Sequence, residues 1–533
     1  MNVVVPAPAL PAARTRLRGP AAAGPWHLRA GPGLAQVEET VRALLEPHLG
    51  ARLLPAASDV PGPELRLTLG QAPPPPRRTV GVAPGGTSEP VDESYGLTVG
   101  QDGIVCRAPT AVGAFRAATT ALQLIALAGP DGELDAQELS DAPRYAWRGL
   151  LVDPARCFVE PGDLRRIVDL AALYKINVLH LHLTDNEGWR IECRSTPSLT
   201  ARHGAEKKAH YSVEEYAALQ EYAARRYITL VPEIDLPGHC ATLRAAVPGL
   251  PDAPAPQGLA GRFPYVPPLD LSDPRTRTVV REVLADVCAM TTGPFVHIGC
   301  DEAVGITDAG FAQAVRALRS LVREFGKRPV AWQESARAGV TEQDLTQYWV
   351  DPDMMELPAT AEELAGRPEL LVAGYTMELV GALRRFFEPS GDDVRRVLAG
   401  GGRLILSPQS HLYLDRGYAA DITPTARAAD AARLGFPSYR PRDVRHTATW
   451  DPAEHGIPED RVAGVEATLF GEVLQGIDDL TTMLLPRLAS VAETAWSGRP
   501  AGWEEHRAAL AHHGRLWTRL RLAYFPATDV PWL

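Results

Sequence analysis

From Trp147 onward, short apolar runs alternate with longer amphipathic segments along the chain. This alternation is typical of repeated βα units, in which a parallel sheet is buried on both faces. Eight runs are visible, at residues 147–153, 177–185, 228–235, 294–302, 329–334, 345–350, 403–408 and 464–472. Eight such units close a TIM barrel. The pattern therefore predicts the α/β class and a (β/α)8 barrel.

The segments between these runs carry helix signals of their own. Pro161 and Ser212 stand at the starts of two amphipathic segments, where proline fits the first helical turn and serine caps the free N–H groups. Two connections, 236–293 and 351–402, are long for such a barrel, and the second contains a helix-like piece at 378–387. Long loops with internal structure tend to shape active sites.

The residues before the barrel predict a separate small domain. They combine helix-like and strand-like patterns, followed by a polar stretch, and the predicted elements are helices at 37–49 and 111–127 and strands at 64–70, 95–100 and 104–108. We therefore expect a mixed α/β accessory domain over residues 1–143 and the barrel over 144–500. The tail, 501–533, is expected to form a helix that packs on the barrel.

Charge and cysteine usage narrow the class of protein. The chain has 54 Lys and Arg against 65 Asp and Glu, a net charge of −11, and no clustered basic run, so we expect neither nucleic acid nor a membrane surface as a partner. The N-terminus lacks the features of a secretory signal, and no apolar window predicts a transmembrane helix, so a cytoplasmic location is expected. The six cysteines form no CxxC pair and are expected to be mostly reduced thiols. The sequence makes no prediction about oligomeric state.

Polar or aromatic side chains follow every predicted strand, and in a TIM barrel such positions ring one mouth. They are Arg156, Asp185, Asp235, His239, Asp301, Glu302, Trp332, Trp349, Tyr413, Asp415 and Glu472. Carboxylates and an arginine bond hydroxyl groups, and Trp and Tyr offer flat apolar faces, so this set suits a neutral sugar. A glycine-rich turn with lysine, typical of a phosphate site, is not visible.

A metal-dependent amidohydrolase is the main alternative. His180 and His182 form an HxH pair on one face of a strand, and with His239 they provide ligand types that zinc accepts. The competing interpretation is that both strand histidines form hydrogen bonds inside the barrel. No further histidine follows a later strand end, so we predict no metal and no cofactor. A third hypothesis, a carbohydrate-binding barrel without activity, conflicts with the adjacent acids Asp301 and Glu302.

The motifs in these runs resemble those of glycoside hydrolase family 20, the β-N-acetylhexosaminidases. The resemblance covers residues 145–498 and rests on several stretches in family order: WRGLLVDPARCF, NVLHLHLTDNEGWR, VPEIDLPGH, VHIGCDE, AWQE, QYWV, LSPQSHLYLD and GVEATLFGE. The domain before the barrel is similar to the small N-terminal domain that accompanies these barrels. The resemblance implies an exo-acting enzyme that hydrolyses terminal non-reducing β-linked GlcNAc or GalNAc from oligosaccharides or glycoconjugates.

The resemblance also implies a retaining, substrate-assisted mechanism, in which the 2-acetamido group of the sugar is the nucleophile. Glu302 would be the general acid and base. Asp301 would accept a hydrogen bond from the acetamide N–H, and Tyr413 would bond its carbonyl oxygen. Asp185 and His239 match positions that act on the acid through hydrogen bonds.

The remaining matched positions would bind the sugar. Asp235 would support the site from behind. Hydrogen bonds to the ring hydroxyls would come from Arg156, Asp415 and Glu472, and the acetamide pocket would be enclosed by Trp332 and Trp349. Phe470 would form an apolar platform, and Trp450 would face the leaving group. The sequence departs from the family pattern at four positions, none of them catalytic: Phe470 replaces Trp, Cys157 replaces His, Cys300 replaces Gly and Asn186 replaces Asp.

Overall fold

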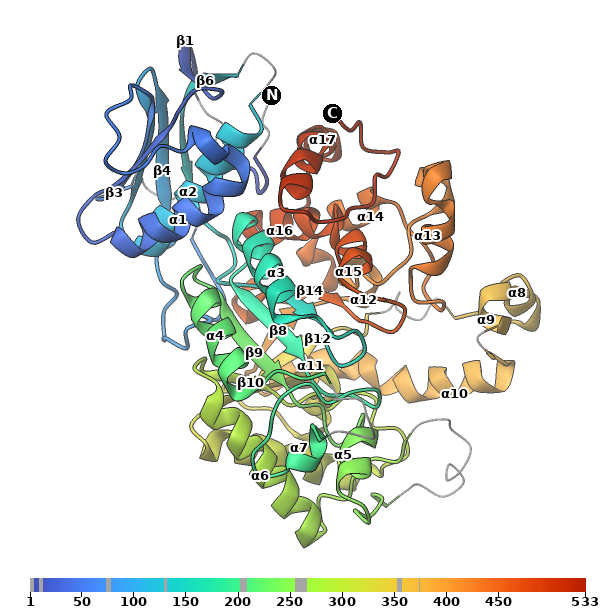
Figure 1. Cartoon of the computed structure of the whole chain (residues 1–533). Coiled ribbons are helices and arrows are strands. Elements are labelled where there is room, and N and C mark those ends of the chain that lie inside the picture. Colours follow the sequence, from blue (N-terminus) through green and yellow to red (C-terminus); the bar gives the residue numbers. More distant parts are fainter. Residues whose placement is uncertain are drawn as a thin grey trace.

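Eight parallel strands close into a barrel at the centre of the molecule (Figure 1). The computed structural model describes residues 4–8, 13–72, 78–128, 132–201, 209–254, 266–351, 357–372 and 374–533. The barrel strands are β7 (Trp147–Val152), β8 (Val178–His182), β9 (Thr229–Glu233), β10 (Phe295–His297), β11 (Arg328–Trp332), β12 (Leu345–Tyr348), β13 (Arg403–Leu406) and β14 (Val462–Leu469). Each lies within or overlaps one of the eight predicted runs, so the predicted fold class is confirmed.

Helices cover the outside of the barrel. Those of at least seven residues are α3 (Pro161–Leu173), α4 (Val213–Ala224), α6 (Pro274–Met290), α7 (Asp308–Glu324), α10 (Met377–Phe387), α11 (Asp393–Ala399), α15 (Ile477–Leu484) and α16 (Arg487–Ser497). Pro161 occupies the first turn of α3, and Ser212 caps α4 in a reciprocal capping box with Glu215, as the sequence predicts. The predicted helix at 378–387 is confirmed as α10.

The barrel interior changes from apolar to polar along the strands. Val178, His180 and His182 alternate along β8 and share its inner face. Val178 joins an apolar cluster at the strand beginnings with Trp147, Val231, Phe295, Val330, Leu345 and Ile405. Further along β8, His180 and His182 place polar groups on the same inner face. Gly149 makes room for this layer, since a Cβ there would lie 2.1 Å from Glu466 Oε2.

The residues before the barrel form a six-stranded sheet with the order β1-β6-β4-β5-β3-β2. Its strands are β1 (Ala13–Ala21), β2 (His27–Ala30), β3 (Glu64–Leu69), β4 (Tyr95–Gly100), β5 (Gly103–Ala108) and β6 (Glu133–Asp141). The helices α1 (Ala35–Leu49) and α2 (Ala111–Ala126) contact each other, and α2 contacts β3, β4 and β5.

Three strands of this sheet differ from the sequence prediction. The sequence prediction assigned no element to the opening residues, yet they contain β1 and β2; residues 1–3 and 9–12 lie outside the described part. The polar stretch expected to close the domain contains β6, which pairs with β1 and β4. Leu134 and Ala136 are buried, whereas Glu133 and Asp135 are exposed and Gln137 is half-buried, so β6 has the strand alternation with few large apolar residues.

The predicted C-terminal helix is α17 (Trp503–Arg519). It is joined to the barrel helices by Trp517, whose Nε1 donates to Tyr174 Oη at 2.8 Å just after α3.

Shorter helices lie in the connections: α5 (Ala241–Ala246), α8 (Ala361–Ala365), α9 (Pro368–Val372), α12 (Gln409–Leu412), α13 (Ala428–Arg433) and α14 (Val444–Ala448). None of the helices in the described ranges has the length and hydropathy to cross a membrane. All six cysteines are buried free thiols.

A buried ion triad joins the small sheet domain to the barrel. Glu93 Oε2 lies 2.8 Å from Arg116 Nε on α2 and 2.7 Å from Arg148 Nη2 on β7. Burial alone would raise the pKa of Glu93, but Arg148 and Arg116 together lower it.

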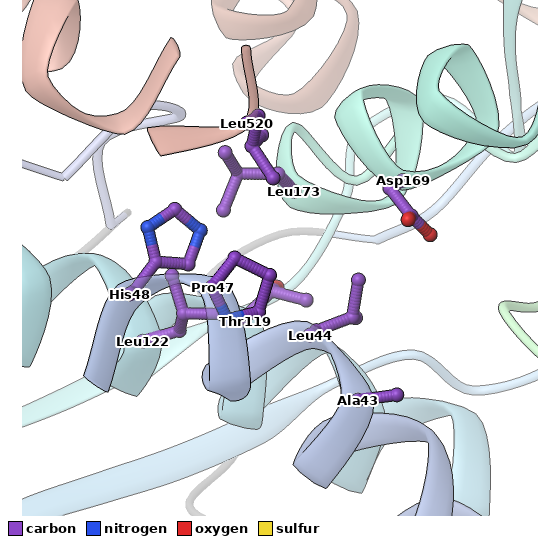
Figure 2. A pocket seen from close by; sticks show the side chains of 9 residues that line it. All are labelled: Ala43, Leu44, Pro47, His48, Thr119, Leu122, Asp169, Leu173 and Leu520. Carbon is purple, nitrogen blue, oxygen red and sulfur yellow. The ribbon is translucent and has the colours of Figure 1, made fainter. Parts of the chain in front are cut away.

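A small, mostly apolar cleft lies nearby between α1, α2, α3 and the end of α17, lined by residues such as Leu44, His48 and Leu173 (Figure 2).

We predict that Glu93→Gln lowers the free energy of unfolding by about 3–5 kcal/mol, because two buried arginines would lose their counter-charge. Since the pKa of Glu93 is lowered on folding, its contribution is present above its ordinary value of 4.5 and is lost as the pH falls through the lower folded value.

Urea denaturation at several pH values measures both effects. Glu64→Gln is the matched control, because Glu64 pairs with Arg66 on the surface and its loss should cost about 0–1 kcal/mol. Equal effects of the two substitutions would contradict a structural role for the triad.

Candidate active site

Side chains from four neighbouring strand ends converge at the C-terminal mouth of the barrel. Arg156, which follows β7, places Nη2 2.6 Å from Asp185 Oδ2, which follows β8. Asp185 Oδ1 lies 3.1 Å from His239 Nδ1, beyond β9. His239 Nε2 lies 3.8 Å from Glu302 Oε2 and 4.0 Å from Asp301 Oδ2, both beyond β10. The mouth thus holds a continuous line of alternating charges that ends at the two adjacent acids.

The backbone that carries these acids is left-handed at three of four successive positions. After β10 the φ angles of Gly299, Cys300 and Glu302 are +65°, +75° and +37°. Gly299 has no alternative, because a Cβ there would lie 1.7 Å from Asp235 Oδ1. The same oxygen accepts a hydrogen bond from the backbone N–H of Cys300 at 3.1 Å. Asp235 therefore holds the loop in shape from behind.

Glu302 has the environment of a general acid. Its side chain is 27% exposed. Burial raises the pKa of Glu302, whereas the neighbouring His239 lowers it. Although burial alone would lower the pKa of His239, Asp185 and the two acids raise it to about 9. His239 is therefore charged at neutral pH and faces a carboxyl group that keeps its proton above the usual range.

Asp301 and Asp235 form a carboxyl pair. Burial raises the pKa of both well above the ordinary value, and the next cause is the negative charge of Glu233 for Asp235 and of Asp235 for Asp301. Asp301 is the more exposed of the two, with 15% of its side chain accessible against 1% for Asp235. Asp301 consequently faces the mouth, and Asp235 lies behind it.

Three further polar residues border the opening. Arg156 Nη1 donates to Asp153 Oδ2 at 2.9 Å and lies 3.8 Å from Glu472 Oε1. Burial and the nearby Glu472 raise the pKa of Asp415 to about 8. Within the described ranges, the buried Oδ1 of Asp415 has no hydrogen-bond partner. Asp415 therefore keeps free hydrogen-bonding capacity for a ligand hydroxyl.

Aromatic rings form the opposite wall. The centroids of Trp332 and Trp349 are 6.3 Å apart, and Tyr413 lies 6.0 Å from Trp349 and 5.3 Å from Phe470. Leu383 and Phe387 of α10 belong to the same cluster. The long connection 351–402 thus packs behind the aromatic wall, in agreement with the expectation that it shapes the site.

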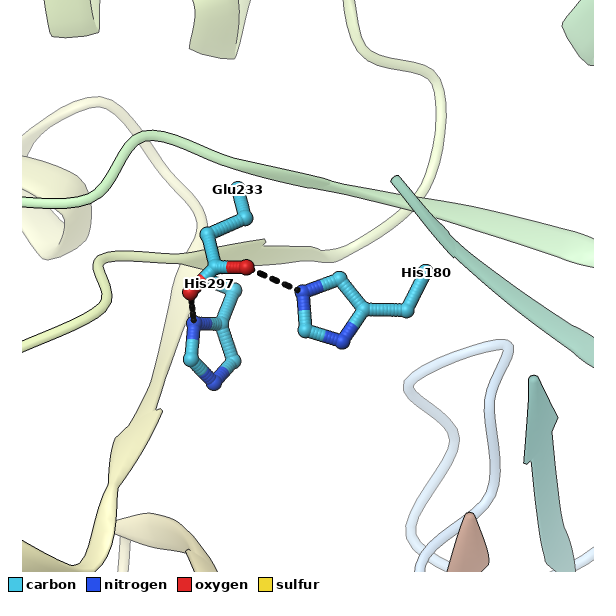
Figure 3. A group of neighbouring side chains, drawn as sticks. All are labelled: His180, Glu233 and His297. Atoms are coloured by element: carbon cyan, nitrogen blue, oxygen red, sulfur yellow. Dashed lines mark ion pairs between the residues drawn. The ribbon is translucent and has the colours of Figure 1, made fainter. Parts of the chain in front are cut away.

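Buried carboxylates and histidines fill the barrel just below the mouth. Glu233 Oε1 lies 2.9 Å from His297 Nδ1, and Glu233 Oε2 lies 3.2 Å from His180 Nε2 (Figure 3). His182 is held between Glu233 Oε2 at 2.6 Å and Asp185 Oδ2 at 2.9 Å. The strand histidines therefore form hydrogen bonds inside the barrel, the competing interpretation of the HxH pair.

Within the part of the chain that the structure describes, three clusters have donor types that could hold a metal ion, with ligand atoms within 4.8 Å of one another: His180/Glu233/His297, His182/Glu233/Asp235 and Asp185/Asp235/His239. In the first two, the oxygens of Glu233 already face ring N–H donors, including Trp332 Nε1 at 2.9 Å. A carboxylate with these donors is better matched to histidinium and indole partners than to a cation.

One predicted residue lies elsewhere. Trp450 is 1% exposed, belongs to the main apolar core and donates its indole N–H to His455 Nε2 at 2.9 Å. Its ring has no free face for a leaving group, so the expected role of Trp450 does not agree with its placement. Tyr439 instead stacks beside Tyr413, with centroids 6.4 Å apart.

Sequence reasoning missed Glu233, Glu334 and Tyr439. Glu334 accepts the indole N–H of Trp349 at 3.0 Å, and burial raises its pKa to about 7. Glu233 and Glu334 lie inside the motifs VPEID and AWQE, close to the predicted site residues Asp235 and Trp332. Their position at strand ends could therefore have identified them. No strand-end pattern marks Tyr439, which comes from a loop beyond β13.

The comparison with known proteins agrees with the geometry. Residues 145–499 match the family described as "Glycosyl hydrolase family 20, catalytic domain". The chain belongs to glycosyl hydrolase family 20. A beta-N-acetylhexosaminidase of Cellulomonas fimi is 33% identical over 453 residues, which cover 83% of this chain and 82% of the relative. As a member of this family, the protein is a glycoside hydrolase, and the resemblance of its motifs is confirmed.

Solved structures of family members share the whole architecture. A mutant Streptomyces plicatus beta-hexosaminidase in complex with its product GlcNAc aligns with a TM-score of 0.76 and 29% identity, covering 99% of this chain and 97% of that one. The family 20 beta-N-acetylhexosaminidase of Streptomyces coelicolor aligns with a TM-score of 0.74 and 27% identity, covering 99% and 98%. These alignments include the small sheet domain as well as the barrel.

We predict that Gly299→Ala destabilises the fold and abolishes most activity, because the added methyl group would displace Asp235 from behind the acids. Gly305→Ala is the matched control: its φ is +91°, but a Cβ there has nothing within 4 Å. Both variants should lose about 1–3 kcal/mol from the left-handed backbone. Gly299→Ala should lose about 1–3 kcal/mol more from the clash.

Thermal unfolding and turnover of an aryl β-N-acetylglucosaminide measure the two effects. If Gly299→Ala and Gly305→Ala were equally stable and equally active, the close packing of Asp235 against the loop would have no consequence.

Proposed function

We propose that the protein is an exo-acting β-N-acetylhexosaminidase that releases terminal, non-reducing β-linked GlcNAc or GalNAc. The observation that carries this proposal is the placement of Asp301 and Glu302, adjacent acids that both face His239 at one strand end. Double-displacement glycosidases use two carboxyl groups on opposite sides of the anomeric carbon, about 5–5.5 Å apart in retaining enzymes. Neighbouring acids on one loop fit a mechanism in which the substrate supplies the nucleophile.

In this mechanism the acetamide carbonyl oxygen attacks the anomeric carbon while the glycosidic bond breaks. Glu302 donates its proton to the departing oxygen, so the leaving group is released as an alcohol. The products of this step are a cyclic oxazolinium and the Glu302 carboxylate. A water molecule then attacks the anomeric carbon from the face that the leaving group vacated, and Glu302 takes its proton. Two inversions retain the β configuration.

The surrounding residues have properties that match this chemistry. Asp301 would accept the acetamide N–H and stabilise the positive charge of the ring. Burial raises the pKa of Tyr413, so its hydroxyl stays protonated and can donate to the acetamide oxygen. Trp332 and Trp349 would enclose the methyl group. An enclosed acetamide reacts more readily because it is held close to the anomeric carbon.

The ring hydroxyls would be bound by Arg156, Asp415 and Glu472. Phe470 would provide the apolar platform beneath the sugar, and the guanidinium of Arg156 lies 5.6 Å above its ring. The metal-dependent amidohydrolase is not favoured by the family assignment. Stoichiometric zinc in the purified protein, together with loss of activity on chelation, would restore that alternative.

We predict that Glu302→Gln lowers kcat about a hundredfold to ten-thousandfold, because the departing oxygen would receive no proton. The loss should be smaller on an activated aryl β-GlcNAc, whose leaving group needs little protonation, than on chitobiose. A thiazoline analogue of the oxazolinium should still bind, because the acetamide pocket is intact. Steady-state kinetics with both substrates tests the assignment, and full activity of the variant would remove Glu302 from the role of acid.

The pH profile provides an independent prediction. The acid must be protonated, so kcat/KM should fall as the pH rises through the raised pKa of Glu302. His239 lowers that pKa through its positive charge, so His239→Gln should move the alkaline limb upward, by about one pH unit. A limb that stays in place, or moves to lower pH, would show that His239 does not act on Glu302 by charge.

A further inference from the structure

Glu233 is a carboxylate that no part of the proposed mechanism uses, although it lies directly beneath the site. It is the last residue of β9 and is fully buried. Its Oε1 accepts the indole N–H of Trp332 at 2.9 Å and lies 2.9 Å from His297 Nδ1. Its Oε2 lies 2.6 Å from His182 Nδ1 and 3.2 Å from His180 Nε2. Each oxygen therefore faces two nitrogens, with the hydrogen bonds from Trp332 Nε1 to Oε1 and from His182 Nδ1 to Oε2.

One side of Glu233 leads to the general acid. His182 links Glu233 to Asp185, with its Nε2 2.9 Å from Asp185 Oδ2. Asp185 in turn holds His239 at 3.1 Å, and His239 faces Glu302 at 3.8 Å. Both ring nitrogens of His182 meet a carboxylate, so the ring is held as a cation between Glu233 and Asp185. The orientation of His239 therefore depends on a relay that starts at Glu233.

The other side of Glu233 leads to the acetamide wall. Trp332 has a single N–H donor, and Glu233 receives it. The ring of Trp332 packs at 6.3 Å against both Trp349 and Phe470, so its orientation affects the neighbouring aromatic faces. The Glu233 carboxylate thus contacts Trp332, a wall of the acetamide pocket, through one oxygen. Through its other oxygen it contacts His182, the first residue of the relay to Glu302.

We propose that Glu233 is a positioning residue that couples the acetamide pocket to the general acid, by fixing Trp332 with one oxygen and the His182–Asp185–His239 relay with the other. This inference rests on the proposed function. Loss of the Glu233 charge should weaken two properties together: the affinity for an acetamide-bearing ligand and the delivery of the proton by Glu302. A residue with a purely structural role would affect stability and leave both properties unchanged.

The chain offers a matched control in Glu466 on β14. Glu466 is equally buried, and its carboxylate bonds the same His180, at 2.8 Å. Its other partners are Trp147 Nε1 at 2.9 Å and Gln347 Nε2 at 3.0 Å, neither of which reaches the mouth through the contacts of this network. Glu466→Gln therefore removes a comparable buried charge without touching Trp332 or His182.

The experiment compares Glu233→Gln, Glu233→Asp and Glu466→Gln, after thermal unfolding has established that each is folded. The first measurement is the dissociation constant of an N-acetylglucosamine-derived thiazoline. The second is kcat/KM on an activated aryl β-GlcNAc and on chitobiose. We expect Glu233→Gln to bind the thiazoline about tenfold to hundredfold more weakly, which corresponds to the loss of a charged hydrogen bond. It should also lose more activity on chitobiose than on the aryl substrate.

Glu233→Asp keeps the charge and should lie between the wild type and Glu233→Gln in both measurements. Glu466→Gln should keep the thiazoline affinity and the wild-type ratio of the two kcat/KM values. If Glu233→Gln and Glu466→Gln behave alike in both measurements, the inference is wrong. If wild-type protein turns over neither substrate, the proposed function itself fails, so the two failures are distinguishable.

A further variant covers the case in which Glu233→Gln does not fold. Trp332→Phe removes the N–H that Glu233 holds and keeps a ring in place. It should weaken thiazoline binding at least about tenfold while the ratio of kcat/KM values stays near that of the wild type. Unchanged binding would show that the bond between Glu233 and Trp332 does not position the pocket wall.

Discussion

The hydrogen bonding of buried carboxylates determines how the upper half of the barrel is filled. Glu233 and Glu466 are both fully buried, and a buried carboxylate is tolerated only when its oxygens are paired. Between them stands His180, with one ring nitrogen 2.8 Å from Glu466 and the other 3.2 Å from Glu233. Burial alone would lower the pKa of His180, yet the two carboxylates raise it to about 9. In the interior, the negative charges of the carboxylates are therefore balanced by histidine. The hydrogen bonds between them hold the strand ends above in place.

The same compensation explains why neighbouring acids at the mouth can behave differently. Burial alone would raise the pKa of Asp185, but His239 and Arg156 hold it well below the usual range, so Asp185 is always charged. Among the described residues Asp301 has no cation at hydrogen-bonding distance, and burial and the charge of Asp235 raise its pKa well above the ordinary value. Glu302 is left with burial as the main influence on its pKa. Carboxyl groups within one mouth thus have pKa values displaced in opposite directions, which is how one site can hold a permanent anion and an acid.

The barrel was predictable from the sequence because its strands are buried on both faces, so most of them appear as short runs rich in apolar residues. The missed strands β1 and β2 are the two edges of the small sheet, and they come from a stretch rich in Pro, Ala and Gly, residues that are uncommon in strands. The site residues were predictable as strand ends, since the topology brings those ends together. The placement of Trp450 was not predictable in this way, because its position after a short helix does not determine whether its ring faces the mouth or the core. Tyr439 comes from a loop, whose path the apolar pattern does not encode.

The strained backbone at residues 299–302 has a physical reason. In an extended strand, successive side chains point to opposite faces, so Asp301 and Glu302 could not both face the mouth. Left-handed φ angles at Cys300 and Glu302 break this alternation, and both carboxyl groups then lie within 4.0 Å of His239 Nε2. Cys300 adopts this conformation where glycine would be easier, with its N–H held by Asp235 Oδ1 at 3.1 Å. Burial raises the pKa of its thiol well above the ordinary value, so the side chain stays protonated and unreactive. The cysteine is therefore compatible with the catalytic loop because its backbone, rather than its sulfur, takes part in positioning the acids.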